Sequence, residues 1–209
     1  MTKKERAAEI MRLLKAEYPQ VKCTLQYETP VQMLIATQLS AQCTDARVNI
    51  VTKTLFKKYK DVYDFANADY NELCDDIRST GFYRNKAKNI ILACQRIIEV
   101  YGGEVPDTME DLLSLAGTGR KTANLVLGDI FKKPAVVVDT HCIRLSNRMG
   151  LTDNSDPEKI EKDLKKLIPP DESLNFCHRL VNHGRVVCSA RAPKGEACVL
   201  NKICKRKGL

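Results

Sequence analysis

The segment of this chain best suited to chemistry contains two glycines separated by one residue. Two basic residues follow the glycines directly. Gly117 and Gly119 stand between two apolar segments with helical spacing, and Arg120 and Lys121 follow at once. Glycine lets a phosphate approach the main chain closely, and the N–H groups at the start of a helix bind anions. The pattern predicts a DNA-binding helix-hairpin-helix over about residues 108–132. The alternative is a plain corner between two helices.

Lys121 lies on the side of the second predicted helix that faces away from the core. At about 100° per residue, the apolar residues of this helix cluster on one side and Lys121 lies nearly opposite them. The cluster consists of Ala123, Val126, Leu127 and Ile130. Lys121 is therefore not a core residue that happens to carry a charge.

Asp139 is a second candidate for chemistry. It follows the buried-looking run 135–138 and precedes a helix that is expected to begin at Thr140. Aspartate commonly caps the N-terminus of a helix. From position alone, Asp139 can be a cap, a chemical group or both.

The elements that must position these residues are helices. Apart from the four-residue run 135–138, no segment has the period of two that predicts a strand. Apolar spacing and capping residues predict about ten helices, at residues 3–17, 30–39, 44–59, 69–78, 85–101, 108–115, 120–132, 140–149, 157–167 and 171–183. The fold class expected is all-α.

The composition and charge favour an ordinary globular protein with an acidic partner. The chain has 209 residues, of which 44% are hydrophobic, and a formal net charge of +8. Residues 185–209 hold seven basic residues against Glu196 alone. Such a field favours nucleic acid, although a solvated basic tail is an equal alternative. With no run of about 20 apolar residues and no signal-peptide pattern, we expect a cytoplasmic protein with reduced cysteines.

The chain resembles the endonuclease III family of DNA glycosylases over nearly its whole length. The matching segments are residues 39–45, 81–83, 86–90, 120–124, 137–144 and 183–185. The resemblance implies two helical lobes with DNA in the groove between them. One lobe would be a six-helix barrel at residues 22–134, and the other would combine residues 1–21 with 135–209.

The resemblance also implies the activity. It implies a monomer that removes oxidised pyrimidines from double-stranded DNA and cleaves the abasic site by β-elimination. Lys121 would attack C1′ and form a Schiff base, and Asp139 would be its paired carboxylate. The adenine mismatch glycosylases share the hairpin but lack this lysine, so its presence here favours the bifunctional enzyme. A non-catalytic DNA-binding protein and a monofunctional glycosylase remain alternatives.

Base removal requires the target nucleotide to leave the duplex, and the resemblance assigns residues to that step. Gln42 would fill the vacated space, and Phe82 would insert from a facing loop. The phosphate backbone and the DNA-facing wall would be contacted by Gly117, Gly119, Arg120 and His141. The alternatives are purely structural roles: a capped turn for Gln42, a core side chain for Phe82 and an ordinary buried histidine for His141.

The cysteine-bearing tail departs from the family pattern. The family commonly holds a [4Fe–4S] cluster with four cysteines, and three of them correspond to Cys188, Cys198 and Cys204. The position of the second ligand is Gly195. Such clusters ordinarily use four thiolates. The cluster is therefore lost, held with a non-cysteine ligand such as Glu196 or water, or replaced by a zinc site, with loss or altered binding favoured.

Overall fold

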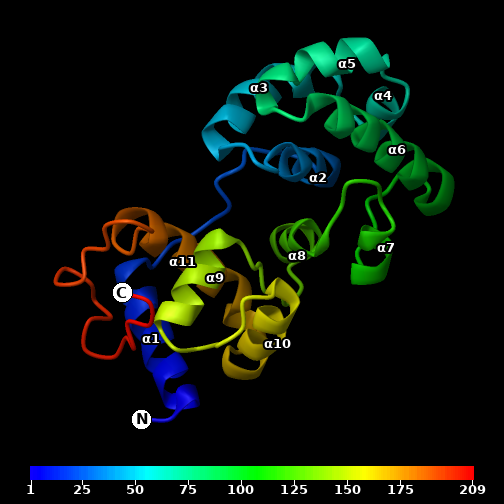
Figure 1. Ribbon diagram of the computed structural model, residues 1–209. Coiled ribbons are helices and arrows are strands. Elements are labelled where there is room, and N and C mark those ends of the chain that lie inside the picture. Colours follow the sequence, from blue (N-terminus) through cyan, green and yellow to red (C-terminus); the bar gives the residue numbers. More distant parts are fainter. The chain divides into compact units, whose positions relative to one another are not determined.

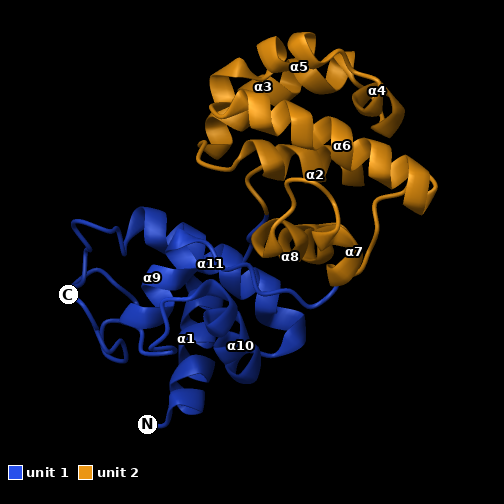
Figure 2. Ribbon diagram, turned by 45° about the vertical axis from the view of Figure 1, so that its right-hand side comes forward, with its two compact units in different colours: residues 1–22, 133–209 blue, residues 23–132 orange.

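A computed structural model of the protein describes residues 1–209 and contains helices but no strands. This confirms the all-α expectation. The chain divides into two compact units, one formed by residues 1–22 with 133–209 and the other by residues 23–132 (Figure 2). None of the helices combines the length and apolar character that crossing a membrane requires.

The unit of residues 23–132 is built around α2 (Pro30–Leu39), in which every residue from Val31 to Leu39 is buried. A helix that is buried all round must be apolar on nearly every side, and α2 carries no charged residue. Thr29 caps it by accepting a hydrogen bond from the Gln32 N–H. Around it pack α3, α6 and α8.

The other helices of this unit pack on the helices that surround α2. The longest, α6, packs against α4 and α5 (Figure 1). In chain order the helices are α3 (Asp45–Lys58), α4 (Val62–Ala66), α5 (Tyr70–Asp76), the 3-10 turn η1 (Arg78–Thr80), α6 (Tyr83–Tyr101), α7 (Met109–Leu113) and α8 (Arg120–Asp129).

The unit of residues 1–22 and 133–209 pairs the first helix of the chain with its last three. These are α1 (Lys3–Glu17), α9 (Thr140–Arg148), α10 (Pro157–Leu167) and α11 (Ser173–Val186), with the turn η2 (Pro170–Glu172) before α11. Helix α11 packs against α1 and α9. At Gly184 the approach is so close that a Cβ would lie 2.5 Å from the His141 ring nitrogen Nδ1 and 2.9 Å from Arg144. Only glycine fits there.

Most predicted helices are found within a few residues of their expected ends, but α4 is missing from the prediction. Its five residues are too few to show a helical period. The local signal is Asp61, which accepts hydrogen bonds from the Tyr63 and Asp64 N–H groups as the N-cap. The run 135–138 is buried but forms no strand, and instead leads to Asp139 as a loop.

Candidate functional site

The two glycines of the hairpin have different roles. Gly117 has a left-handed backbone with φ 73°, and a Cβ there would lie 2.8 Å from the Asn89 Cβ. Gly119 is the N-cap of α8 with φ −93°, and a Cβ there would meet nothing within 4 Å. Gly117 is therefore required by conformation and packing, whereas Gly119 leaves the start of α8 uncovered.

The start of α8 has the properties of an anion site. Gly119 provides no side-chain cap, and the first turn contains no acidic residue. The first N–H groups of a helix lack partners within the helix and carry the positive end of its dipole. Arg120 is half-buried and Lys121 is exposed in this first turn. The arrangement suits a phosphate, and Lys121 is exposed in the same turn.

Gln38 of α2 anchors the hairpin loop through its side-chain amide. Its Nε2 donates to the Ala116 carbonyl at 2.9 Å and to the Thr118 Oγ1 at 3.2 Å. The loop on which Gly117 lies is therefore fixed to the central helix of its unit.

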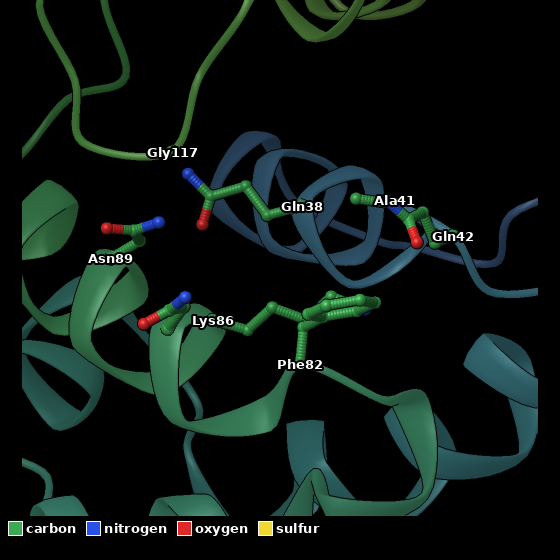
Figure 3. A pocket seen from close by; sticks show the side chains of 8 residues that line it. Gln38, Ala41, Gln42, Phe82, Lys86, Asn89 and Gly117 are labelled. Atoms are coloured by element: carbon green, nitrogen blue, oxygen red, sulfur yellow. The ribbon is translucent and has the colours of Figure 1, made fainter.

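Gln42 and Phe82 lie on two loops that flank one hollow of about 150 Å³ (Figure 3). Both have left-handed backbone angles, with φ 54° at Gln42 and 49° at Phe82. Phe82 is 63% exposed, so the alternative that it is an ordinary core side chain is wrong. Non-glycine residues in this region are strained, and such residues cluster at functional sites. The hollow is also lined by Gln38, Ala41, Asn85, Lys86, Asn89 and Gly117.

Lys86 joins the two loops. Its Nζ donates to the Leu39 carbonyl at 2.8 Å, just before the Gln42 loop, and to the Thr80 carbonyl at 2.9 Å, just before the Phe82 loop. The residue is only 6% exposed, and burial lowers the pKa of its ammonium group. One buried lysine thus holds both strained residues in place.

Asp139 is a helix cap in this structure. Its Oδ1 accepts a hydrogen bond of 2.7 Å from the Cys142 N–H at the start of α9, and its side chain is partly exposed. A cap of this kind uses one carboxylate oxygen and fixes the direction of the other. The capping role anticipated from the sequence is confirmed, and it is compatible with chemistry at Oδ2.

His141 is the second residue of α9 and has intermediate exposure. Its Nδ1 is 3.2 Å from Arg144 Nη2, and the same nitrogen of Arg144 donates to the carbonyls of Gly184 and Cys188. These contacts tie α9 to the end of α11. Nothing in them assigns His141 a role toward DNA.

Arg148, at the end of α9, holds the C-terminal loop. Its buried guanidinium donates to the Ser189 carbonyl at 2.7 Å and the Ala190 carbonyl at 3.0 Å, and it lies 3.2 Å from the Cys188 sulfur. The Arg148 carbonyl in turn accepts from the Lys207 N–H at 3.2 Å. The loop is therefore secured at both of its ends by one residue.

The three thiols of this loop do not fit a four-thiolate cluster. The Cys198 sulfur lies 3.3 Å from Nε2 of the buried His183, and the Cys188 sulfur faces Arg148. Burial raises the pKa of the Cys198 and Cys204 thiols. No group of three or more His, Cys, Asp or Glu side chains is arranged to hold a metal ion. Gly195 is exposed and offers no ligand.

Sequence reasoning missed Gln38, Lys86 and Arg148. Lys86 lies inside a segment that was recognised as a motif, but a lysine gives no sign that it is buried. Gln38 was visible as a polar residue in a mostly apolar helix, which also contains Gln32 and Thr37. That contrast is a signal that could have marked it.

Comparisons with known proteins agree with these features. Residues 35–170 match the model of the HhH-GPD superfamily of base excision DNA repair proteins. The chain is 53% identical to endonuclease III of Synechocystis sp. over 204 residues, covering 97% of this chain and 93% of the relative. It is 35% identical to endonuclease III of Escherichia coli, covering 98% and 97%. A solved structure of a trapped endonuclease III–DNA covalent intermediate matches with a TM-score of 0.94 at 42% identity, covering 99% of this chain and 97% of that one.

Proposed function

Because this chain belongs to the endonuclease III family of base excision DNA repair proteins, it is a DNA glycosylase and abasic-site lyase, and we propose that Lys121 and Asp139 carry out its reactions. The observation that supports this most strongly is the exposed Lys121 amine in the first turn of a helix whose N-terminus has no capping side chain. The proposed substrate is double-stranded DNA containing oxidised pyrimidines or abasic sites.

Lys121 supplies the nucleophile. Its neutral Nζ forms a bond to C1′ of the damaged nucleoside while the bond from C1′ to the base breaks, and the base leaves with that electron pair and takes up a proton. Opening of the sugar ring then gives a Schiff base between Nζ and C1′. Loss of a proton from C2′ expels the 3′ phosphate by β-elimination, and water finally releases the lysine.

Asp139 supplies a carboxylate. With Oδ1 engaged by the Cys142 N–H, Oδ2 is available to accept the lysine proton or to stabilise positive charge that develops at C1′. The cap restricts the carboxylate to one orientation, and a preorganised charge is worth more in catalysis than a mobile one.

Most of the proposed DNA contacts come from the unit of residues 23–132. The N–H groups at the start of α8, together with Gly117, Gly119 and Arg120, are proposed to hold a backbone phosphate, which positions the duplex without reading sequence. Gln42 and Phe82 are proposed to enter the stack when the damaged nucleotide is flipped out. His141 is proposed as a further contact beside Asp139.

The tail is proposed to lack an ordinary [4Fe–4S] cluster. Three thiols and Gly195 replace the four thiolates that such clusters use, and Arg148 already binds the loop carbonyls. None of the steps above passes through a metal group.

Borohydride trapping tests the assignment of Lys121. Borohydride reduces the Schiff base to a stable amine, so the wild-type protein should become crosslinked to DNA that carries an oxidised pyrimidine or an abasic site. Lys121→Gln should give no crosslink and no strand cleavage. Lys132→Gln is the matched control, because Lys132 is an exposed lysine just beyond the other end of α8.

The outcomes separate the alternatives. Crosslinking that persists in Lys121→Gln would place the nucleophile elsewhere. Base release by the wild type without strand cleavage would indicate a monofunctional glycosylase, and binding without either reaction would indicate a non-catalytic DNA-binding protein.

A further inference from the structure

The side chain of Lys86 binds the ends of two helices, and each of these ends leads into one of the two strained loops. Leu39 is the last residue of α2 and Thr80 is the last residue of η1. The carbonyls of both accept a hydrogen bond from Lys86 Nζ, at 2.8 Å and 2.9 Å. The last carbonyls of a helix lack partners within the helix and attract cations. One buried ammonium group therefore caps both helix ends.

Lys86 also holds Phe82 through the main chain. Phe82 is the N-cap of α6, and its carbonyl accepts the first hydrogen bond of that helix from the Lys86 N–H at 3.1 Å. The short segment from Thr80 to Phe82 thus has one contact with the Lys86 side chain and one with the Lys86 main chain. A shift of the Phe82 backbone therefore displaces Lys86 as well.

The loop of Gln42 starts at the other carbonyl that Lys86 binds. Ser40 is the C-cap of α2, and its carbonyl accepts from the Cys43 N–H at 3.1 Å. Gln42 therefore lies in a closed turn that begins one residue after Leu39. Because the turn is so short, movement of the Leu39 carbonyl changes the direction of the Gln42 side chain. Gln42, Phe82 and Lys86 line the same hollow (Figure 3).

A donor shared by two loops has a consequence that two separate anchors would not have. Leu39, Thr80 and Lys86 are all buried. A buried carbonyl that loses its donor costs free energy. If one loop moves and takes Lys86 with it, the carbonyl that precedes the other loop loses its partner. The two loops are therefore more stable when they keep a fixed geometry to each other.

This arrangement points to a role in nucleotide flipping. On the basis of the proposed glycosylase function, we propose that Lys86 is a positioning residue that couples the two loops, so that Gln42 and Phe82 enter the base stack together. Lys86 contacts neither the DNA nor the reacting atoms in this role. It acts only through the two exposed side chains whose loops it holds.

Two reactions of the same protein depend differently on this coupling. Excision requires an intact, stacked nucleotide to leave the duplex, and extrusion costs less where the base is already damaged or missing. A preformed abasic site has no base to unstack. Misplacement of a positioning group by about 1 Å can cost about 100-fold in rate. Loss of the coupling should therefore slow excision more than cleavage of a preformed abasic site.

Lys86→Met tests the proposal, because methionine has a similar length but no N–H donor. Single-turnover rates are measured for removal of thymine glycol, an oxidised pyrimidine, and for cleavage of a preformed abasic site. We expect excision to fall by roughly 10- to 100-fold and cleavage by less than about threefold. An equal fall of both rates would indicate structural support alone and would overturn the proposal, as would two unchanged rates.

Arg179→Met is the matched control. Arg179 is also a buried cation that donates to a backbone carbonyl, that of Tyr18 at 3.2 Å, but it lies in the unit of residues 1–22 and 133–209. This variant should lose stability and keep the wild-type ratio of the two rates. A wild type that releases no base and forms no borohydride crosslink would instead overturn the proposed function.

A second test leaves Lys86 in place and so does not depend on the folding of Lys86→Met. The excision rates of Gln42→Ala, Phe82→Ala and the double variant are compared with that of the wild type. If the two side chains enter together, the double variant should lose less than the product of the two single losses. In the Lys86→Met background the losses should multiply. Losses that multiply in the presence of Lys86 would show that the loops act independently and would overturn the proposal.

Discussion

Gln42 and Phe82 line one hollow from two separate loops, and both hold the left-handed backbone that non-glycine residues avoid. Each such residue costs about 1 kcal/mol or more. The cost is sustained because Lys86 fixes the chain just before each loop. Two exposed side chains are thereby held ready for contact rather than left to find their positions on binding.

Replacing Gln42 by glycine should stabilise the protein and impair its function. Glycine adopts φ 54° without strain. We expect the relief of about 1–3 kcal/mol of strain to exceed the cost of about 0.4–1 kcal/mol that the greater freedom of glycine adds through the unfolded state, so the free energy of unfolding should rise. Loss of the side chain should weaken binding to a duplex with an abasic-site analogue. Thermal unfolding and equilibrium binding measure the two effects. A variant that is less stable than the wild type would show that Gln42 is not strained.

The hairpin glycines should respond differently to alanine. Gly117→Ala places a Cβ 2.8 Å from that of Asn89 at a left-handed position, so we expect a loss of about 2 kcal/mol of stability. Gly119→Ala meets no atom and should change stability by less than about 1 kcal/mol. Chemical denaturation of the two variants compares them directly. Equal losses would contradict the separate roles assigned to the two residues.

Glu172 should contribute stability that is lost in acid. Hydrogen bonds from Lys15 and Arg179 lower the pKa of Glu172 from its ordinary value of 4.5. The folded state therefore favours the carboxylate, and its contribution is complete above pH 4.5 and disappears as the pH falls through the lowered pKa. Glu172→Gln should cost about 1 kcal/mol at pH 7 and much less near pH 3.

The control for this comparison is Glu9→Gln, which removes an exposed ion pair with Arg12 on α1. It should alter stability little at either pH. A Glu172→Gln deficit that stays constant from neutral pH to acid would show that the carboxylate charge is not the cause.

Restoring a fourth thiol should restore cluster binding. The position of Gly195 is exposed, and a Cβ there would meet nothing within 4 Å, so Gly195→Cys can be accommodated. After anaerobic incubation with ferrous iron and sulfide, this variant should gain visible absorption and about four iron atoms per chain. The wild type treated in the same way should not. Four bound iron atoms in the wild type would refute the proposed loss of the ordinary cluster.

The fold was largely predictable because its determinants are local. Thr29 and Pro30 mark the start of α2, and the family motifs mark the hairpin and the start of α9. Helix α4 was missed because five residues show no period. The start of α6 was placed late because it depends on the left-handed backbone of Phe82, which is unusual for an aromatic residue.

The candidate site was predictable only where chemistry depends on residue type. Lys121 carries an amine and Asp139 a carboxylate, and the reactivity of these groups follows from residue type alone. Lys86 and Gln38 act through contacts with distant backbone carbonyls, those of Leu39 and Thr80 for one and Ala116 for the other. Such contacts arise only when the helices pack, so a linear pattern of residues does not reveal them.

The contacts of Arg148 determine what the docking of the C-terminal tail depends on. A guanidinium that binds backbone carbonyls requires neither iron nor sulfide for assembly, and oxidants do not break it. With the cluster lost, as proposed, we expect a tail held in this way to stay docked during iron starvation and during oxidative stress. We expect the repair activity to be retained when oxidised pyrimidines are most abundant.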